Sequence, residues 1–259
     1  MDNFNIKKIK WLKGWKDLPE AYYPLKVPGV TTIIGDLIPD PEYDQFVKDV
    51  GEEKAKQITE AAWDRGHAMH AFFEHFIKKL AETKDPSEAL QHTQTVTPTI
   101  LIENGTTTVG IDKGRDMFFN FYYSDYSNKY VDLIGTELAI YSPKYFFRGL
   151  TDVFYNERGI GRVVTDFKTT SKQIEKGTTK WLKYHRQLGA YAVGIEDMFE
   201  ATGKEVKVNK SSILAVHTKS NLIQEITCEG SELEEQKNEF KTLCIEWHKT
   251  NGQSFLFND

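Results

Sequence analysis

The sequence predicts an α/β fold with a central mixed sheet flanked by helices and preceded by an N-terminal helical region. Between residues 44 and 80, apolar side chains recur at three- and four-residue spacing, which is typical of helices. Residues 136–170 hold three short runs rich in β-branched and aromatic residues, which indicate strands. Helical patterns at 178–199 and 231–250 then enclose two more strand-like runs, at 212–217 and 223–228.

Length and composition favour one domain. The chain has 259 residues, and its 16 Phe, 12 Tyr and 5 Trp supply enough apolar bulk for a core. We expect a single domain over 1–259, with an N-terminal arm and helical region over 1–130 and the α/β core over 131–259. The formal net charge of −5 gives no general attraction to nucleic acid. Any DNA path therefore requires a local basic stripe, or bound metal that cancels nearby carboxylates.

Cysteine content and hydropathy set further expectations. Two cysteines, Cys228 and Cys244, are too few for a disulfide framework or for an iron–sulfur cluster held by four thiolates, so we expect them to be buried and inert. No apolar run approaches the roughly 18 residues of a membrane span, and the N-terminus lacks the apolar stretch of a signal peptide. The expectation is a cytoplasmic protein without membrane contact.

Residues 1–27 alternate basic and aromatic side chains. Two interpretations stay open for this segment: an edge strand with a docking arm, or a platform on which the bases of a single strand stack against Trp11, Trp15, Tyr22 and Tyr23.

The helical region begins after Pro39-Asp40-Pro41, and Gly51 separates two helices in it. On the second helix, His70 and Glu74 are four residues apart and share a face, with His67 one turn earlier. These three residues could bind zinc. His70 could instead serve a magnesium site on the sheet, or be a buried, hydrogen-bonded histidine without catalytic role.

The next two segments are less informative. Residues 81–110 are polar and rich in threonine, which favours a loop or a weakly specified strand. Residues 112–130 suit a helix whose aromatic stripe, at Met117, Phe118, Phe121 and Tyr122, belongs to the core.

A hairpin carries the strongest chemical signal. The runs 148–155 and 162–170 read as strands joined by a turn at 156–161. Because strand side chains alternate, Asp166 and Lys168 point to one side and Phe167 to the other. The hairpin brings Asp152 beside them. Two carboxylates and an ammonium on one sheet face are costly unless they hold a cation or a charged substrate. This pattern is typical of a metal-dependent phosphodiesterase site.

The segment after this hairpin is basic. It ends in a helix on which Gln187 and Tyr191 lie one turn apart. The charges form either a solvated helix face or a set of phosphate contacts; they are Lys172, Lys176, Lys180, Lys183 and Arg186. Further along, Ser231 followed by Glu234 suggests a capping box at the start of the closing helix.

Several motifs in order carry a family resemblance over about residues 28 to 217. They are Val30-Thr31-Thr32-Ile33-Ile34, Arg65 to His70 with Glu74, Asp152, Asp166-Phe167-Lys168, and Gln187 to Tyr191. Together they resemble the PD-(D/E)XK nuclease superfamily in its RecB-like exonuclease branch, which includes phage exonucleases and the mitochondrial genome maintenance exonuclease. One departure is Thr151, which stands where the motif's proline would precede Asp152.

The resemblance implies a restriction-endonuclease-like core with the N-terminal helical region over its site. It implies Mg²⁺ or Mn²⁺ bound by Asp152, Asp166, the backbone carbonyl of Phe167 and His70, while the two cysteines are too few for an iron–sulfur cluster. Lys168 joins the two acids and His70 as a catalytic residue. A glutamate at the place of Glu137 commonly assists near the metal in such relatives, although Glu137 could equally be a surface carboxylate on an edge strand. Glu74, part of the helical histidine motif, is a further candidate site residue. Substrate contacts are expected from Gln187, Tyr191, Thr169, Lys172 and Arg186.

The function so predicted is metal-dependent exonucleolytic hydrolysis of DNA that is single-stranded or has a free end. The setting would be replication, recombination or repair in a bacterial cell or phage-infected host, with a recombinase or helicase as the kind of protein partner considered. Two alternatives remain: an endonuclease of the same fold, and a catalytically quiet module that only binds nucleic acid.

Overall fold

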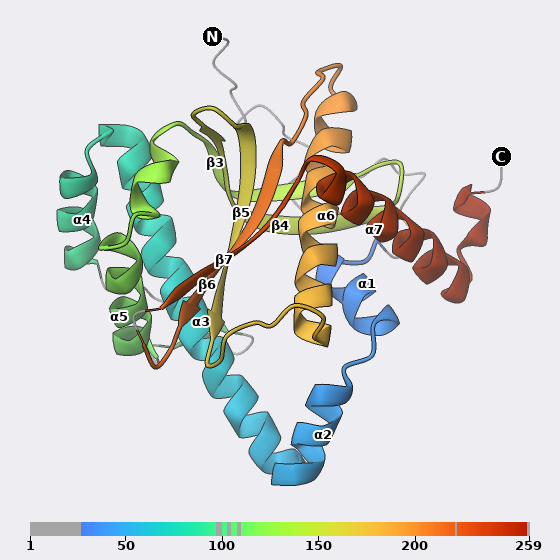
Figure 1. The fold of residues 1–259 in the computed structure, drawn as a ribbon, viewed down its shortest axis with the longest axis horizontal. Coiled ribbons are helices and arrows are strands. Elements are labelled where there is room, and N and C mark those ends of the chain that lie inside the picture. The colour runs from blue at the N-terminus through green and yellow to red at the C-terminus, as the bar shows by residue number, and fades with distance from the viewer. Residues whose placement is uncertain (1–26, 97–99, 103–104, 108–109, 221, 258–259) are drawn as a thin grey trace.

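The computed structural model describes residues 27–96, 100–102, 105–107, 110–220 and 222–257. Its centre is a five-stranded sheet in the order β3-β4-β5-β6-β7 (Figure 1). Only β5 and β6 run parallel, so the sheet is mixed, as predicted. The strands are β3 (Leu133–Ser142), β4 (Phe147–Glu157), β5 (Gly161–Thr170), β6 (Lys210–His217) and β7 (Ile223–Glu229).

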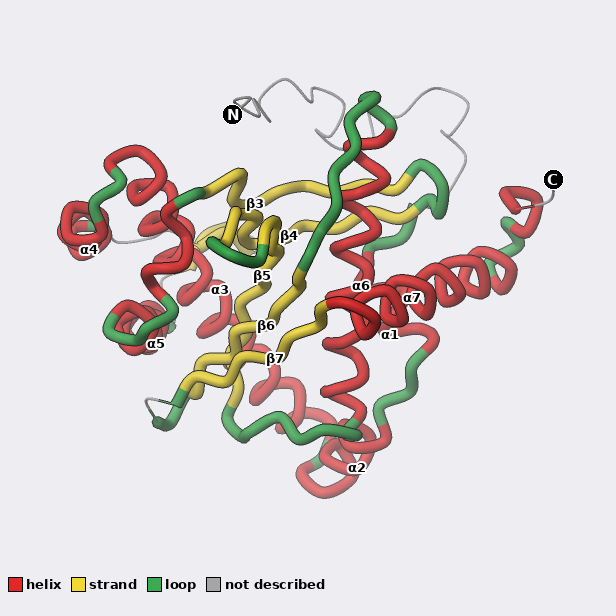
Figure 2. Tube along the Cα trace, turned by 45° about the horizontal axis from the view of Figure 1, so that its top comes forward, coloured by secondary structure: helices red, strands yellow, loops and turns green. Residues whose placement is uncertain are grey.

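Helices cover both faces of this sheet (Figures 1 and 2). One layer holds α1 (Val30–Leu37), α6 (Thr179–Glu200) and α7 (Gly230–Thr250), and the other holds α3 (Glu52–Thr83), α4 (Pro86–Thr95) and α5 (Ile111–Tyr122). Each layer buries its own apolar cluster against the sheet. The second cluster is strongly aromatic, because Phe167 of β5 packs against Phe73 and Phe121 at ring-centroid distances of 4.4 and 5.8 Å.

Local signals explain the long helical region. Asp40 caps α2 (Pro41–Val50) by accepting a hydrogen bond from the Tyr43 N–H at 3.1 Å, and Pro41 occupies the first turn. Gly51, with a φ of +86°, separates α2 from α3, as predicted. Figure 1 shows α2 and the first half of α3 extending beyond the sheet. There α2 meets the start of α6, where the Lys183 ammonium lies 3.0 Å from the Asp40 carboxylate.

A close helix crossing positions α3. At Gly114 of α5, an added Cβ would lie 2.5 Å from the Cβ of Ala68 and 2.7 Å from the backbone nitrogen of Met69. Only glycine allows α5 to approach α3 this closely. The crossing lies immediately before His70 in α3, so it helps to determine where that histidine stands.

The structure corrects several boundaries. Residues 86–95 form the helix α4 rather than a loop or weak strand, because Asp85 caps its first turn through the N–H groups of Ser87 and Glu88. Two short strands follow, β1 (Ile100–Ile102) and β2 (Gly105–Thr107), in a separate sheet. The helix predicted at 112–130 ends at Tyr122, before a 3-10 turn at Ser127–Val131.

Two helix starts also differ from expectation. The helix α1 was not predicted, since its β-branched residues resemble a strand. The proposed capping box at Ser231 and Glu234 is wrong, because α7 already begins at Gly230 and its N-cap residue, Glu229, makes no side-chain cap hydrogen bond.

The interpretations offered for residues 1–26 lie outside the described residues. Among the helices that are described, none is both long enough and apolar enough to span a membrane.

Candidate active site

The hairpin of β4 and β5 places the two predicted acids side by side. Val153 pairs with Thr165 in antiparallel register, so Asp152 stands opposite Asp166. Both carboxylates are buried, with 8% and 3% of their surface exposed. Buried acids this close require compensation from neighbouring groups.

Lys168 and the helix α6 surround Asp166. The Lys168 ammonium forms an ion pair with one oxygen of the Asp166 carboxylate. The other oxygen, Oδ1, accepts a hydrogen bond from the Tyr191 hydroxyl at 3.0 Å, and that hydroxyl accepts one from Gln187 Nε2 at 2.6 Å. Gln187 and Tyr191 are both buried. The predicted pair on α6 therefore reaches the site through Asp166.

His70 and the backbone of β5 hold Asp152. Its Oδ1 lies 3.1 Å from His70 Nδ1, and its Oδ2 accepts a hydrogen bond from the Phe167 N–H at 2.5 Å. His70 therefore reaches the sheet from α3. This hydrogen bond fits both a histidine that serves a metal site on the sheet and a hydrogen-bonded histidine without a catalytic role.

Glu137 of β3 completes the cluster in an unusual conformation. Its φ of +49° lies in the left-handed region, which a residue other than glycine adopts at a cost of about 1–3 kcal/mol. The ligand atoms of His70, Glu137 and Asp152 all lie within 4.8 Å of one another. Glu137 is half-buried and faces the site, so it is not an exposed edge carboxylate. Strain of this kind is concentrated at functional sites.

The charges in this cluster shift one another's protonation. Burial raises the pKa of Glu137, and the nearby Asp152 and Glu74 charges raise it further, to about 7. Burial lowers the pKa of His70, but the charge and hydrogen bond of Asp152 outweigh it, so the net shift is upward.

The two aspartates shift in opposite directions. Burial raises the pKa of Asp152, but the charge and hydrogen bond of His70, with the Lys168 charge and the Phe167 N–H, lower it below its usual value. Burial raises the pKa of Asp166; Lys168 lowers it, Asp152 raises it, and the net shift is upward. One acid is therefore stabilised as an anion at the expense of its neighbour.

These groups fit a divalent cation of the magnesium class. Carboxylate oxygens with one imidazole, and no sulfur, form a hard ligand set. A cation would also stabilise Glu137 as an anion, which burial otherwise disfavours. The residues that would hold it are His70, Glu137 and Asp152. Asp166 stands beside them, and its carboxylate is engaged by Lys168 and Tyr191.

Other predicted site residues are placed less directly. Thr169 lies near Gly66 of α3, whose added Cβ would be 3.8 Å from the threonine hydroxyl. Lys172 is exposed on the loop between β5 and α6. Glu74 pairs with Lys78 along α3. Arg186 turns away from the acids and toward α7, where it bonds to Gln236 and Glu239.

The zinc alternative from α3 alone is not supported by the geometry. His67 is exposed, and among the described residues the group that His70 joins contains Glu137 and Asp152 rather than His67 and Glu74.

Sequence reasoning missed Tyr184 as a neighbour of the site, and it named Lys180 only as a member of the basic segment. Tyr184, two turns before Tyr191 on α6, has its pKa raised to about 12 because burial outweighs the opposing charge of Lys168. The seven-residue spacing of these tyrosines was a usable signal. Lys180 donates from its ammonium to the Thr170 hydroxyl at 3.2 Å, at the end of β5.

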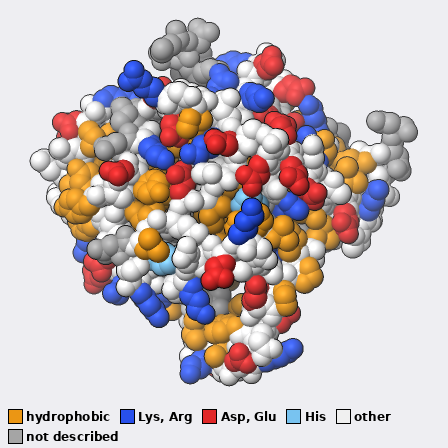
Figure 3. Space-filling view, viewed as in Figure 1, with side chains coloured by type: hydrophobic (Ala, Val, Ile, Leu, Met, Phe, Trp, Pro, Cys, Tyr) orange, Lys and Arg blue, Asp and Glu red, His pale blue; other side chains and the backbone are white. Residues whose placement is uncertain are grey.

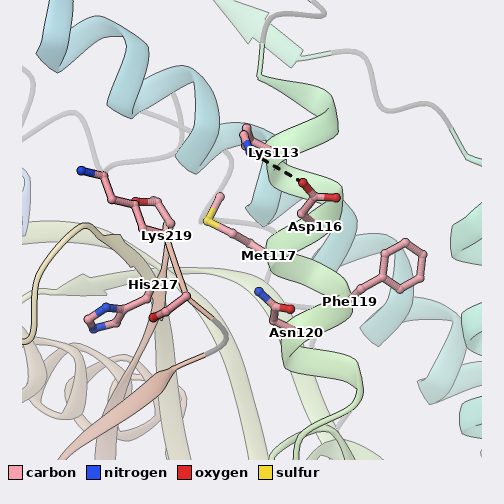
Figure 4. A pocket seen from close by; sticks show the side chains of 9 residues that line it. Lys113, Asp116, Met117, Phe119, Asn120, His217 and Lys219 are labelled. Carbon is pink, nitrogen blue, oxygen red and sulfur yellow. Dashed lines mark ion pairs between the residues drawn. The ribbon is translucent and has the colours of Figure 1, made fainter.

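A separate hollow of about 610 Å³ lies between α5 and the end of β6. Figure 4 shows Met117 and Asn120 on one side, His217 and Lys219 on the other, and an ion pair between Lys113 and Asp116 at its edge. None of the acids of the Asp152 cluster lines it. This hollow, despite its volume, therefore lies apart from the acids of the candidate active site.

A mixed sheet whose adjacent strands carry acids and a lysine, met by a histidine from a covering helix, defines a nuclease-like α/β protein. The family model of the PD-(D/E)XK nuclease superfamily matches residues 43–257. The chain belongs to this superfamily, and its chemistry is phosphodiester hydrolysis.

Two solved structures are similar to parts of the chain. One is a candidate exonuclease from Eubacterium rectale, with 13% identity and a TM-score of 0.40 over 71% of this chain and 68% of that one. The other is SSO0001, with 14% identity and a TM-score of 0.25 over 42% of this chain and 50% of that one. No curated protein matches the sequence.

Proposed function

We propose that this protein is a Mg²⁺- or Mn²⁺-dependent DNA exonuclease acting on DNA that is single-stranded or has a free end. The observation that carries the proposal is the convergence of His70, Glu137 and Asp152 beside the Asp166–Lys168 ion pair. Membership of the nuclease superfamily supports the reaction class. The exonuclease assignment and the choice of metal are our inference from the site and the resemblance.

A bound divalent metal would polarise the scissile phosphate and lower the pKa of an attacking water. His70, Glu137 and Asp152 would hold it, with Asp166 and the Phe167 carbonyl as the further ligands that the sequence predicts. His70 contacts one oxygen of the Asp152 carboxylate and the Phe167 N–H donates to the other, so both oxygens are held in place. Such positioning is worth most where charge develops during the reaction.

Lys168 would act on the substrate. Burial lowers its pKa, but the Asp166 and Asp152 charges outweigh this effect and keep the ammonium protonated. A charged lysine here orients the attacking water or stabilises the negative charge of the transition state. Tyr191, which accepts a hydrogen bond from Gln187, donates to Asp166 Oδ1, whereas Lys168 pairs with Oδ2, so the tyrosine helps to hold the lysine's partner in place.

A DNA path is suggested by one stripe on α3. Trp63, His67, His70 and Glu74 recur at helical spacing and share a face. Trp63 is 64% exposed, and aromatic faces of this kind stack the bases of single strands. In Figure 3, acidic and basic side chains are interspersed on the face shown. We therefore expect the DNA to follow a narrow path, held by base stacking and a few lysines, rather than to bind across a broad basic face.

The arrangement of α2 supports dependence on a DNA end. Asp40 joins Lys183 of α6, and the Thr179 N–H donates to the Glu42 carboxylate at 3.4 Å. These contacts join the start of α2 to the start of α6, and Gly51 joins the other end of α2 to α3. A strand that passes between α3 and α6 would then enter by its end.

The decisive experiment compares linear and covalently closed DNA, each single- and double-stranded, with Mg²⁺ and with Mn²⁺. We expect progressive loss of linear single strands and persistence of circles. Digestion of circles at a similar rate would instead support the endonuclease alternative. Binding without cleavage of any substrate, by folded protein with either metal, would support the quiet binding module.

The stacking path has its own test. Trp63→Ala should weaken binding of single-stranded DNA by about 5- to 150-fold, the range for losing one stacked base, while the rate at saturating DNA changes little. The matched control is Tyr123→Ala, which removes an aromatic side chain that is 75% exposed outside this stripe. Equal effects of both changes would exclude a specific role for Trp63.

Several wider assignments belong to the same proposal. They are a single domain over 1–259, with residues 1–130 forming the arm and the helical cover of the site, and cytoplasmic action in DNA replication, recombination or repair. A recombinase or helicase partner would be sought by co-purification.

A further inference from the structure

A second cluster of ligand-type side chains lies outside the nuclease site. His185 of α6, Cys228 of β7 and Glu232 of α7 have ligand atoms that all lie within 4.8 Å of one another. His185 Nδ1 is 3.2 Å from Cys228 Sγ and 3.7 Å from Glu232 Oε1. One ring nitrogen therefore faces both partners, which come from three different elements of the fold.

The surroundings hold this cluster in place. His185 and Cys228 are buried, and the Trp181 ring lies against the imidazole with a centroid distance of 3.7 Å. One turn further along α6, an added Cβ at Gly189 would overlap the backbone of Gln236 in α7. Helices α6 and α7 are thus in backbone contact beside the cluster. Glu232, by contrast, has 46% of its side chain exposed and leaves one side open to solvent.

The ligand chemistry differs from that of the nuclease site. Sulfur, imidazole nitrogen and one carboxylate form the set that zinc prefers, whereas magnesium favours oxygen. Burial, with the charges of Arg186 and Lys176, lowers the pKa of His185 to about 4, so the imidazole is neutral at pH 7, which is its ligating form. Burial raises the pKa of Cys228 to about 12, so this thiol stays protonated until a metal displaces its proton.

We propose that His185, Cys228 and Glu232 bind a thiophilic divalent cation of the zinc class, separate from the metal of the nuclease site. Binding forms bonds from the metal to Nδ1, Sγ and a carboxylate oxygen, and the Cys228 proton leaves to solvent. No oxidation or reduction is involved. The fourth position of a tetrahedral zinc would be taken by water on the open side of Glu232.

Such a metal would join three elements that the sequence separates. It would tie α6 to the edge strand β7 and to the first turn of α7. Gln187 and Tyr191, which reach Asp166, lie on the same helix within two turns of His185. The second site would therefore stabilise the helix that positions the nuclease acid.

Cobalt absorption tests the proposal on the full chain. Co²⁺ bound by a thiolate gives a near-ultraviolet sulfur-to-metal charge-transfer band, which oxygen and imidazole ligands of the nuclease site cannot produce. The chain contains only two cysteines, so the source of the band is readily assigned. We expect a saturable band in the parent, its retention in Cys244→Ala, its loss in Cys228→Ala, and its displacement by Zn²⁺.

Two further variants separate binding from folding. Glu232→Gln changes a half-exposed side chain and should keep the fold, yet weaken Co²⁺ binding by at least about tenfold, a lower bound for loss of one ligand. His185→Gln should weaken it at least as much. Absence of the band in the parent, its persistence in Cys228→Ala, or unchanged affinity in Glu232→Gln would each overturn the site as assigned.

Discussion

His70 and His185 each lie in a cluster of three possible metal ligands, but the charges around the two imidazole rings differ. Each histidine has a carboxylate within 4 Å, and each belongs to a three-residue group of possible ligands. Yet the pKa of His70 is raised, whereas that of His185 is lowered to about 4. Burial lowers the pKa of both histidines. The two values differ because different neighbouring charges oppose burial at each ring.

At His70, Asp152 is itself buried and hydrogen-bonded to the ring, so its charge is poorly screened. At His185, the direct partner is a neutral thiol, and the nearby charges of Arg186 and Lys176 are positive. Glu232 is half-exposed and 3.7 Å away. The distance to a carboxylate therefore does not by itself determine whether a histidine is protonated. The burial of that carboxylate and the other charges near the ring also decide it.

The largest effect should appear in catalysis, at the Asp166–Lys168 ion pair beside the His70 cluster. Asp166→Asn and Lys168→Ala should each lower the rate of DNA cleavage by at least about 10²-fold, as when one transition-state charge partner is removed. Both variants should keep a cooperative thermal transition. Lys144→Ala is the matched control, because this lysine pairs with Asp197 and Glu200 outside the site. Cleavage at the parent rate by either variant would exclude the mechanism proposed here.

Protonation should separate the two histidines next. In metal-free protein, NMR of the imidazole protons should show that His70 titrates with a pKa above the usual value of about 6.5. His185 should stay neutral as the pH falls to about 4. Saturating Mg²⁺ should lower the apparent pKa of His70, because a ligating ring is neutral. Identical titration of both rings would contradict the comparison.

Metal should stabilise the first cluster through Glu137. At about tenfold excess over its Kd, Mg²⁺ should add roughly 1.4 kcal/mol, from RT ln(1 + [L]/Kd), and raise the melting temperature by about 2–4 °C. Glu137→Gln removes a half-buried carboxylate whose charged form burial disfavours, so it should be at least as stable as the parent without metal and gain little with it. Ionic strength must be matched, since screening mimics part of the effect. Equal gains in both proteins would remove Glu137 from the ligand set.

The smallest effect concerns acid stability at His185. Its folded pKa of about 4 lies below the unfolded value of about 6.5, so only the unfolded chain takes up a proton between these values. This histidine therefore contributes stability that is present above pH 6.5 and is lost as the pH falls toward 4. His185→Gln should show a shallower fall in melting temperature over that window. A parallel fall in both proteins would show that other groups dominate.

The sequence predicted the sheet and the site hairpin well because their signals are local. Alternation of Asp166, Phe167 and Lys168 fixes which side chains share a face, and a short turn brings Asp152 opposite. The order of helices and strands followed from periodicity in the same way. Failures came where local signals conflicted: β-branched residues form the helix α1, and a threonine-rich stretch forms α4 because Asp85 caps it.

Other features depend on distant parts of the chain. The left-handed backbone of Glu137 has no signature in its own sequence, since glutamate does not favour a positive φ. The direction of Arg186 toward α7 requires knowing how two helices cross. Cys228, expected to be inert, meets His185 only because β7 and α6 pack together, 43 residues apart. No spacing motif connects them.

The glycine at position 114 has a practical consequence for engineering. Ala68 and Met69 touch α5 at this point, directly before His70. A methyl group there would force the helices apart, at a typical cost of about 1–3 kcal/mol for an overfilled core. The same displacement would move the histidine away from its aspartate. Variant libraries aimed at a more thermostable α5 should therefore leave Gly114 fixed, although it lies on a helix that contributes no side chain to the proposed chemistry.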